Sequence, residues 1–186
     1  MVLEQASKLL LPGELSDDAV LLRPFTEADI PALIKIVDDT TIHDRNHAPS
    51  PTEEAIREWI NNGVKRAEAG QSVQFAVCDK ATGALAGRRG IRLEQDERRA
   101  RVGAWIGKEW RGQGFSPRSA RLVAAWAFDM WPVDRIGAEC DVDNEASYKA
   151  LIKAGFKCEG VLRAYSLSNS GERRDQYSFS LLPEDL

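Results

Sequence analysis

The sequence is poor in the residues that build metal sites and disulfide frameworks. Its 186 residues include three cysteines and two histidines. Cys78, Cys140 and Cys158 are far apart, no C-x-x-C pair occurs, and His43 and His47 lie in a different region of the chain. We therefore expect neither a metal centre nor a set of disulfides.

Long hydrophobic runs are also absent. No apolar run approaches the ~20 residues that span a bilayer, and the N-terminal residues lack the apolar core of a signal peptide. We therefore expect a cytoplasmic protein that does not bind membranes. The net charge of -4 argues against general nucleic-acid binding. The length predicts a single domain over residues 1–186, long enough to form its own core.

Hydrophobic periodicity predicts an alternation of strands and helices. The expected strands are 19–25, 72–79, 84–94, 98–106, 135–141, 157–168 and 172–182. The expected helices run from Thr26 to about Asp39, from about residue 51 to Gly70, from Pro117 to about Met130, and over 144–154, with a loop over 40–51. Thr26 and Asp29 have the spacing of a capping box.

The connections between these segments predict how the strands pair. Short turns join the strands from residue 72 to residue 106, which indicates an antiparallel meander. The strand–loop–helix–strand unit over 98–141 predicts one parallel pair with a right-handed crossover. We therefore expect a mixed α/β sheet with helices packed on it.

The segment from Trp105 to Pro117 has the composition of an anion-binding loop. Gly112 and Gly114 leave the backbone free to direct several N–H groups at one point. The helix expected at Pro117, with Ser116 as its N-cap, adds further free N–H groups and the positive end of its dipole. A phosphate group is the ligand that such a loop favours.

Two common phosphate-loop types do not match this segment. The Walker pattern G-x-x-x-x-G-K-[ST] does not occur anywhere in the sequence. The dinucleotide pattern G-x-G-x-x-G fails because Pro117 stands at its third glycine. A Rossmann domain also stacks several parallel units, whereas this chain predicts one crossover after a meander.

A third type matches. The string R-G-Q-G-F-S at 111–116 resembles the R/Q-x-x-G-x-G/A loop of the GNAT acetyltransferases, which binds the pyrophosphate of acetyl-CoA. The strings at 21–29, 103–116, 135–156 and 159–165 resemble the RimJ/RimL branch of that family, which includes ribosomal-protein N-terminal acetyltransferases. The resemblance implies a GNAT-type α/β fold with a mixed, mostly antiparallel central sheet flanked by helices.

The resemblance also implies the reaction, a direct transfer of an acetyl group from acetyl-CoA to a primary amine. The amine is a protein N-terminus or a small molecule, and the sequence does not specify which. The backbone of Trp105 and Ile106 would bind the pantetheine arm and polarise the thioester carbonyl. The pyrophosphate would be cradled by Arg111, Gly112, Gln113, Gly114, Phe115 and Ser116. Ser116 departs from the Gly/Ala of the pattern.

The far wall of the same site is implied by the segment N-E-A-S. Asn144 would bind the pantetheine and Ser147 would face the thiol sulfur. Ser147 is a candidate proton donor because Leu151 occupies the place where many family members have a tyrosine. On the residues alone, a purely structural interpretation is favoured, with Asn144 as an N-cap and Ser147 as a first-turn residue. Glu94 and Glu139 are candidate bases for the amine.

Two further predictions concern charge and function class. A basic hairpin contains Arg88, Arg89, Arg92, Arg98, Arg99 and Arg101, and a solvated sheet face is favoured for it over contact with the CoA phosphate or with an RNA-rich partner. The alternative function is a non-catalytic acyl-CoA-binding or regulatory module, suggested by Leu151 and Ser116. Homodimers are common in the RimJ/RimL branch, although the sequence itself gives no argument for one.

Overall fold

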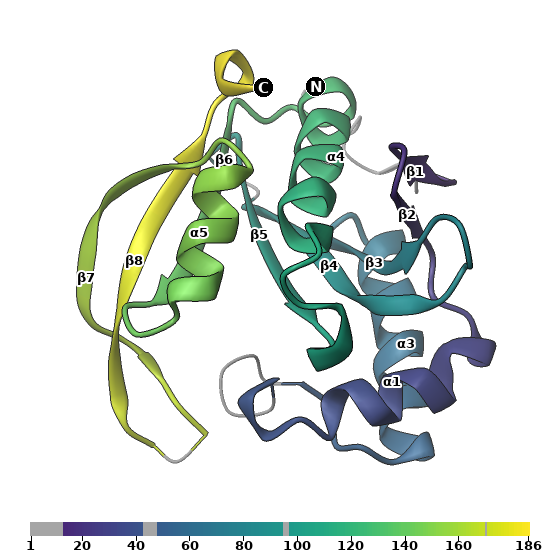
Figure 1. Cartoon of the computed structure of the whole chain (residues 1–186). Helices are drawn as coiled ribbons and strands as arrows, with labels where there is room; N and C mark the ends of the chain where they lie inside the picture. Colours follow the sequence, from purple (N-terminus) through teal and green to yellow (C-terminus); the bar gives the residue numbers. More distant parts are fainter. Residues whose placement is uncertain (1–12, 43–47, 95–96, 170) are drawn as a thin grey trace.

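An eight-stranded sheet with the order β1-β2-β3-β4-β5-β6-β8-β7 forms the centre of the computed structural model (Figure 1). The structure describes residues 13–42, 48–94, 97–169 and 171–186. The strands are β1 (Leu15–Ser16), β2 (Val20–Arg23), β3 (Ser72–Asp79), β4 (Leu85–Glu94), β5 (Arg99–Ile106), β6 (Arg135–Asp141), β7 (Lys157–Leu167) and β8 (Arg173–Leu181). Among the strands of the described residues, only β5 and β6 pair in parallel, so the predicted mixed, mostly antiparallel sheet is confirmed.

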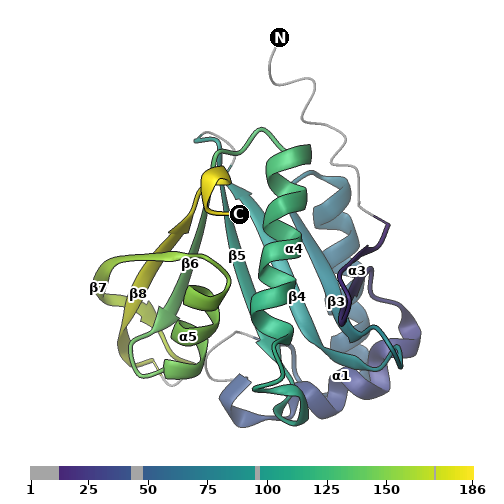
Figure 2. The same ribbon diagram turned by 45° about the horizontal axis from the view of Figure 1, so that its top comes forward.

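The helices cover both faces of this sheet, as Figures 1 and 2 show. The α-helices are α1 (Ile30–Val37), α3 (Glu53–Glu68), α4 (Phe115–Met130) and α5 (Glu145–Lys153), and the 3-10 turns are Glu27–Asp29, Lys108–Trp110 and Pro183–Asp185. Helices α4 and α5 pack on one face of the sheet, and α1 and α3 pack on the other. No helix in the described part of the chain is long and apolar enough to cross a membrane.

Side-chain alternation along the strands divides the core into two clusters, one for each face. On β5, Ala100 and Val102 are buried in the cluster that contains the α4 side chains, whereas Trp105 belongs to the cluster under α1 and α3. Arg101 lies between Ala100 and Val102, so it points to the face opposite α4. The same alternation places Ala138 under α4 and α5, and Glu139 on the opposite face.

The entry into α1 confirms the predicted capping box. The backbone N–H of Thr26 donates to the Asp29 carboxylate at 2.8 Å, and the Thr26 side chain completes the reciprocal pair. Asp29 is buried, at 5% exposed, and also accepts two hydrogen bonds from the Arg23 guanidinium. These contacts fix the direction in which the chain leaves β2 and enters α1.

The two parallel strands separate along their length. Their register contains three pairs only: Arg99 with Arg135, Ala100 with Ile136, and Arg101 with Gly137. Beyond these pairs β5 and β6 diverge, which both views show (Figures 1 and 2). The backbone edge of β5 after Arg101 therefore has no strand partner on the β6 side, and the two strands are splayed apart toward the end of β5.

Two predicted boundaries were wrong. Helix α4 begins at Phe115 rather than Pro117, and its N-cap is Gly114, with φ 89°, rather than Ser116. A left-handed glycine at this position turns the chain into the helix two residues earlier than the proline suggested. In the predicted loop over 40–51, residues 40–42 are helical.

Candidate functional site

The loop that joins β5 to α4 presents unpaired backbone donors. In the described part of the chain, the N–H groups of residues 112–116 donate to no protein acceptor. Gly112 and Gly114 both have positive φ, 77° and 89°, a conformation that L side chains rarely adopt. Five N–H groups at the start of a 16-residue helix form a site suited to an anion with several oxygens.

The side chains of Gln113 and Phe115 form contacts that stabilise the conformation of the loop. The Gln113 amide donates to the carbonyl of Glu109 at 2.7 Å. The Phe115 ring is buried and packs edge-on against Trp110, with the ring centroids 5.2 Å apart. These contacts leave the backbone, rather than the side chains of Gln113 and Phe115, to contact a ligand.

Arg111 ties the loop to the neighbouring helix. Its guanidinium lies 2.7 Å from the Asp39 carboxylate, just beyond α1, and also donates to the Thr41 hydroxyl at 3.3 Å and to the Ile106 carbonyl at 3.1 Å. A hydrogen bond from Thr41, together with the charge of Arg111, lowers the pKa of Asp39. The contact of Arg111 with the pyrophosphate stays a prediction, and in this structure the Arg111 side chain is engaged with protein partners.

Arg89 lies beneath the loop and is only 2% exposed. Its guanidinium donates to the Ser116 carbonyl at 2.6 Å and to the hydroxyls of Ser116 and Ser119 at 3.1–3.2 Å. The prediction of a solvated face was therefore wrong for Arg89, because its position on β4 points toward α4. The Ser116 hydroxyl, which departs from the sequence pattern, accepts one of these bonds.

Asn144 and Ser147 lie where β6 passes into α5. Asn144 is the N-cap of α5, and its Oδ1 accepts from the Ser147 backbone N–H at 3.1 Å. Burial raises the pKa of the Cys140 thiol on β6 to about 11, and a side-chain hydrogen bond with Ser147 opposes this rise. Ser147 therefore lies beside β6, the strand that diverges from β5, while Leu151 is buried.

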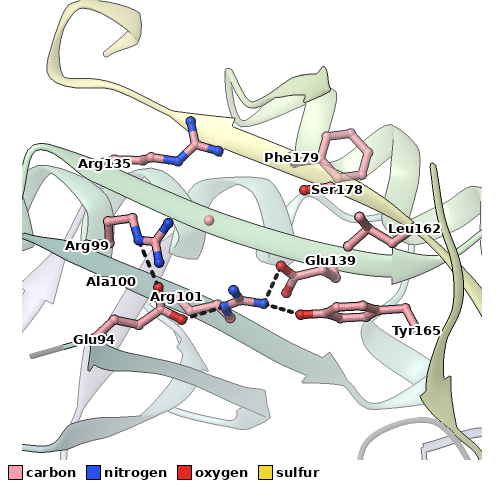
Figure 3. A pocket seen from close by; sticks show the side chains of 11 residues that line it. Glu94, Arg99, Ala100, Arg101, Arg135, Glu139, Leu162, Tyr165, Ser178 and Phe179 are labelled. Carbon is pink, nitrogen blue, oxygen red and sulfur yellow. Dashed lines mark hydrogen bonds and ion pairs between the residues drawn. The ribbon is translucent and has the colours of Figure 1, made fainter. Parts of the chain in front are cut away.

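A polar cavity of about 160 Å³ lies at the point where β5 and β6 begin to separate. Arg101 is at its centre (Figure 3). The Arg101 guanidinium forms ion pairs with Glu94 of β4 and Glu139 of β6, and it donates to the Tyr165 hydroxyl of β7 at 2.9 Å. The structure thus brings together the two candidate bases that were predicted from distant segments.

The two carboxylates in this cavity differ in environment. Burial raises the pKa of Glu139, whose side chain is 15% exposed, and the positive charge of Arg101 opposes that rise. Glu94 is on β4, the strand next to β5, and forms an ion pair with the same Arg101 side chain. A carboxylate with a raised pKa is better matched to accepting a proton near neutral pH than an ordinary surface glutamate.

Comparison with known proteins identifies the family of this chain. Residues 19–157 match the profile of the acetyltransferase (GNAT) domain. The chain belongs to the GNAT acetyltransferase family. It is an acetyl-CoA-dependent N-acetyltransferase by this membership, with acetyl-CoA as the acetyl donor.

Individual relatives agree with this membership. YoaA of Bacillus subtilis, an uncharacterised N-acetyltransferase, is 31% identical over 158 residues, which cover 83% of this chain and 89% of the relative. RimJ of Mycobacterium smegmatis, solved with CoA-disulfide, superposes with a TM-score of 0.80 at 22% identity and covers 94% of this chain and 88% of its own. RimL, a ribosomal alpha-N-protein acetyltransferase, superposes with a TM-score of 0.81 at 20% identity, covering 91% of this chain and 93% of its own.

These likenesses confirm the predicted GNAT fold, and RimJ and RimL are among the proteins that share it. Sequence reasoning did not assign Asp39, Arg89 or Arg101 to the site. The basic hairpin was noted, but the face and depth of each arginine depend on strand register, which the sequence does not show. His43 and His47 lie outside the described residues.

Proposed function

We propose that this acetyltransferase acts on a primary amine, either a protein N-terminus or a small-molecule amine, by direct transfer in the cleft between β5 and β6. The observation that carries the proposal is the alignment of three features along one path. The free N–H groups of residues 112–116 lie at the end of β5, the unpaired edge of β5 leads back from them, and the polar cavity lies where the strands meet.

These three features determine how acetyl-CoA binds. The pyrophosphate binds the N–H groups of residues 112–116, and the pantetheine arm follows the open edge of β5 at Trp105 and Ile106. The N–H groups on that edge stabilise the negative charge that develops on the thioester oxygen, an effect of a few kcal/mol in comparable sites. On the opposite wall, the side-chain amide of Asn144 remains a donor for the pantetheine because only its oxygen is used in capping.

The acceptor amine enters from the cavity on the face opposite α4. Its nitrogen attacks the thioester carbon, the N–C bond forms as the C–S bond breaks, and the sulfur leaves as a thiolate. Glu139 takes the proton of the amine, since burial has raised its pKa. Arg101 and Glu94 fix the position of Glu139. The thiolate takes a proton from the Ser147 hydroxyl beside β6, and Ser147 regains it from solvent.

A panel assay tests the proposal. The protein is incubated with acetyl-CoA and with N-terminal peptides, polyamines, aminoglycosides and small amino compounds, and free thiol and acetylated product are measured together. We expect stoichiometric thiol release and amide formation with at least one class of amine. Tight CoA binding without turnover on any amine would instead favour the alternative, a non-catalytic acyl-CoA-binding or regulatory module, to which the buried Leu151 in the usual tyrosine position lends support.

A further inference from the structure

Arg89 is a buried cation whose hydrogen bonds all go to the first two turns of α4. Its Nε and Nη2 both donate to the Ser119 hydroxyl, and Nη2 also reaches the carbonyl and the hydroxyl of Ser116. The Ser119 hydroxyl in turn donates to the Ser116 carbonyl at 3.0 Å. The guanidinium is therefore built into the base of the loop that carries the free N–H groups.

No carboxylate in the described ranges lies within ion-pair distance of Arg89. Three more exposed arginines, Arg23, Arg101 and Arg111, each have a carboxylate partner. Burial and the neighbouring Arg88 lower the pKa of Arg89 to about 9, so it keeps its charge at neutral pH. Burying a charge without a counter-ion is costly, which indicates that an anion completes this site.

We propose that Arg89 is a positioning residue for the CoA pyrophosphate: from beneath the loop it holds the first turn of α4 through Ser116 and Ser119, and its charge balances that of the pyrophosphate. This inference rests on the proposed function and adds to the backbone N–H groups a fixed charge from β4. The low-dielectric surroundings strengthen the attraction, since no solvent screens a guanidinium that is 2% exposed.

The same contacts account for Ser116. A glycine or alanine at this position would give Arg89 only the backbone carbonyl, whereas the serine hydroxyl adds a second acceptor at 3.2 Å. Ser116 and Arg89 therefore form a unit, and the departure of Ser116 from the sequence pattern serves the buried arginine rather than the ligand directly.

The test compares two acetyl donors that differ in the pyrophosphate. The full chain is assayed with acetyl-CoA and with S-acetylpantetheine, which lacks the pyrophosphate and nucleotide, using the amine identified by the panel. We expect Arg89→Met to lower kcat/KM for acetyl-CoA at least tenfold, mainly through KM, and to change kcat/KM for S-acetylpantetheine less than twofold. An equal loss with both donors, or no loss with either, would overturn the inference.

Two further variants keep the test decisive if Arg89→Met does not fold. Arg89→Lys keeps a charge at the same place, and we expect it to retain most of the preference for acetyl-CoA. Complete loss of that preference in a folded Arg89→Lys protein would contradict a role for the charge. Arg88→Met is the matched control, because Arg88 is the neighbouring residue of β4 on the opposite face and bonds Gln74 instead of α4.

The failure of this inference is distinguishable from the failure of the proposed function. Calorimetric titration of the wild-type protein with CoA supplies the reference. Absence of CoA binding to the wild type would contradict the proposed function itself. Wild-type binding that Arg89→Met leaves unchanged would contradict only the role of Arg89, whereas a tenfold weaker CoA affinity in this variant supports it whether or not an amine is acetylated.

Discussion

The Arg111 guanidinium lies 2.7 Å from the Asp39 carboxylate, and this ion pair joins the anion-binding loop to the chain segment that follows α1. The same side chain donates to the Ile106 carbonyl at the end of β5. Arg111 thus connects the last residue of the cleft-forming strand, the loop and the α1 side of the molecule. The pair belongs to the architecture of the loop, and its function is to hold the free N–H groups in place.

We expect Arg111→Ala to weaken CoA binding about fivefold to tenfold, because the loop loses its attachment to Asp39 and Ile106. Global stability should change by less than about 1 kcal/mol, since the Arg111 side chain is largely exposed and exposed pairs contribute little. Calorimetry and urea unfolding measure the two effects. Asp39→Ala should weaken binding similarly, and the double variant should be no worse than Arg111→Ala. Fully additive losses would show that the two residues act independently.

Gly112→Val should weaken CoA binding at least tenfold while the protein stays folded. Gly112 has φ 77°, so a β-branched residue strains the loop and redirects its N–H groups, although a Cβ meets no atom within 4 Å. Gly83→Val is the matched control: Gly83 has φ 73° and equally open surroundings, but it lies in the turn between β3 and β4. A folded Gly112→Val protein with unchanged CoA affinity would contradict the proposal that this loop binds the pyrophosphate.

The pH dependence of the reaction should report Glu139. The carboxylate must be ionised to accept a proton, so kcat should fall as the pH drops through its pKa, and burial places that pKa above the ordinary range of a glutamate. We expect Glu139→Gln to lower kcat by roughly 100-fold, a common size for loss of a general base. The fall in kcat at low pH, the acidic limb of the pH profile, should be absent in Glu139→Gln. A limb that persists in Glu139→Gln would assign the base to another group.

Asp29 should make stability depend on pH in the acid range. Burial raises the pKa of Asp29, but the hydrogen bonds from Arg23 and Thr26 outweigh this and lower it overall. The stabilisation is therefore complete above the unfolded-state pKa of about 4 and is lost as the pH falls through the lower folded-state pKa. Asp29→Asn should cost about 2 kcal/mol near pH 7, since it leaves Arg23 without its partner. Urea unfolding at pH 7 and pH 3 should show this difference shrinking at pH 3, and Glu27→Gln, at an exposed position, should show no such trend.

The elements of the fold could be predicted because each carries its own periodicity. The apolar spacing of α4 and the alternation of β3 are local signals. Gly112 and Gly114 likewise indicate a loop whose backbone can adopt positive φ. The start of α4 was predicted two residues late because Pro117 is a good first-turn residue, and the sequence does not show that Gly114 takes the left-handed cap position.

The contacts between segments could not be predicted in the same way. Arg88 and Arg89 are adjacent and chemically identical, yet only the register of β4 decides that Arg89 lies under α4. The grouping of Glu94, Arg101 and Glu139 depends on the parallel pairing of β5 with β6, and on the point where that pairing ends. Arginine is rarely buried, so composition favours a solvated face for each residue of the hairpin.

A crystal structure of the complex with CoA tests the central claim most directly. The account predicts pyrophosphate oxygens within hydrogen-bonding distance of the N–H groups of residues 112–116, with the pantetheine arm between β5 and β6 and its thiol directed toward the Arg101 cavity. An ordered CoA whose pyrophosphate lies away from this loop, or whose pantetheine lies outside the cleft, would contradict it.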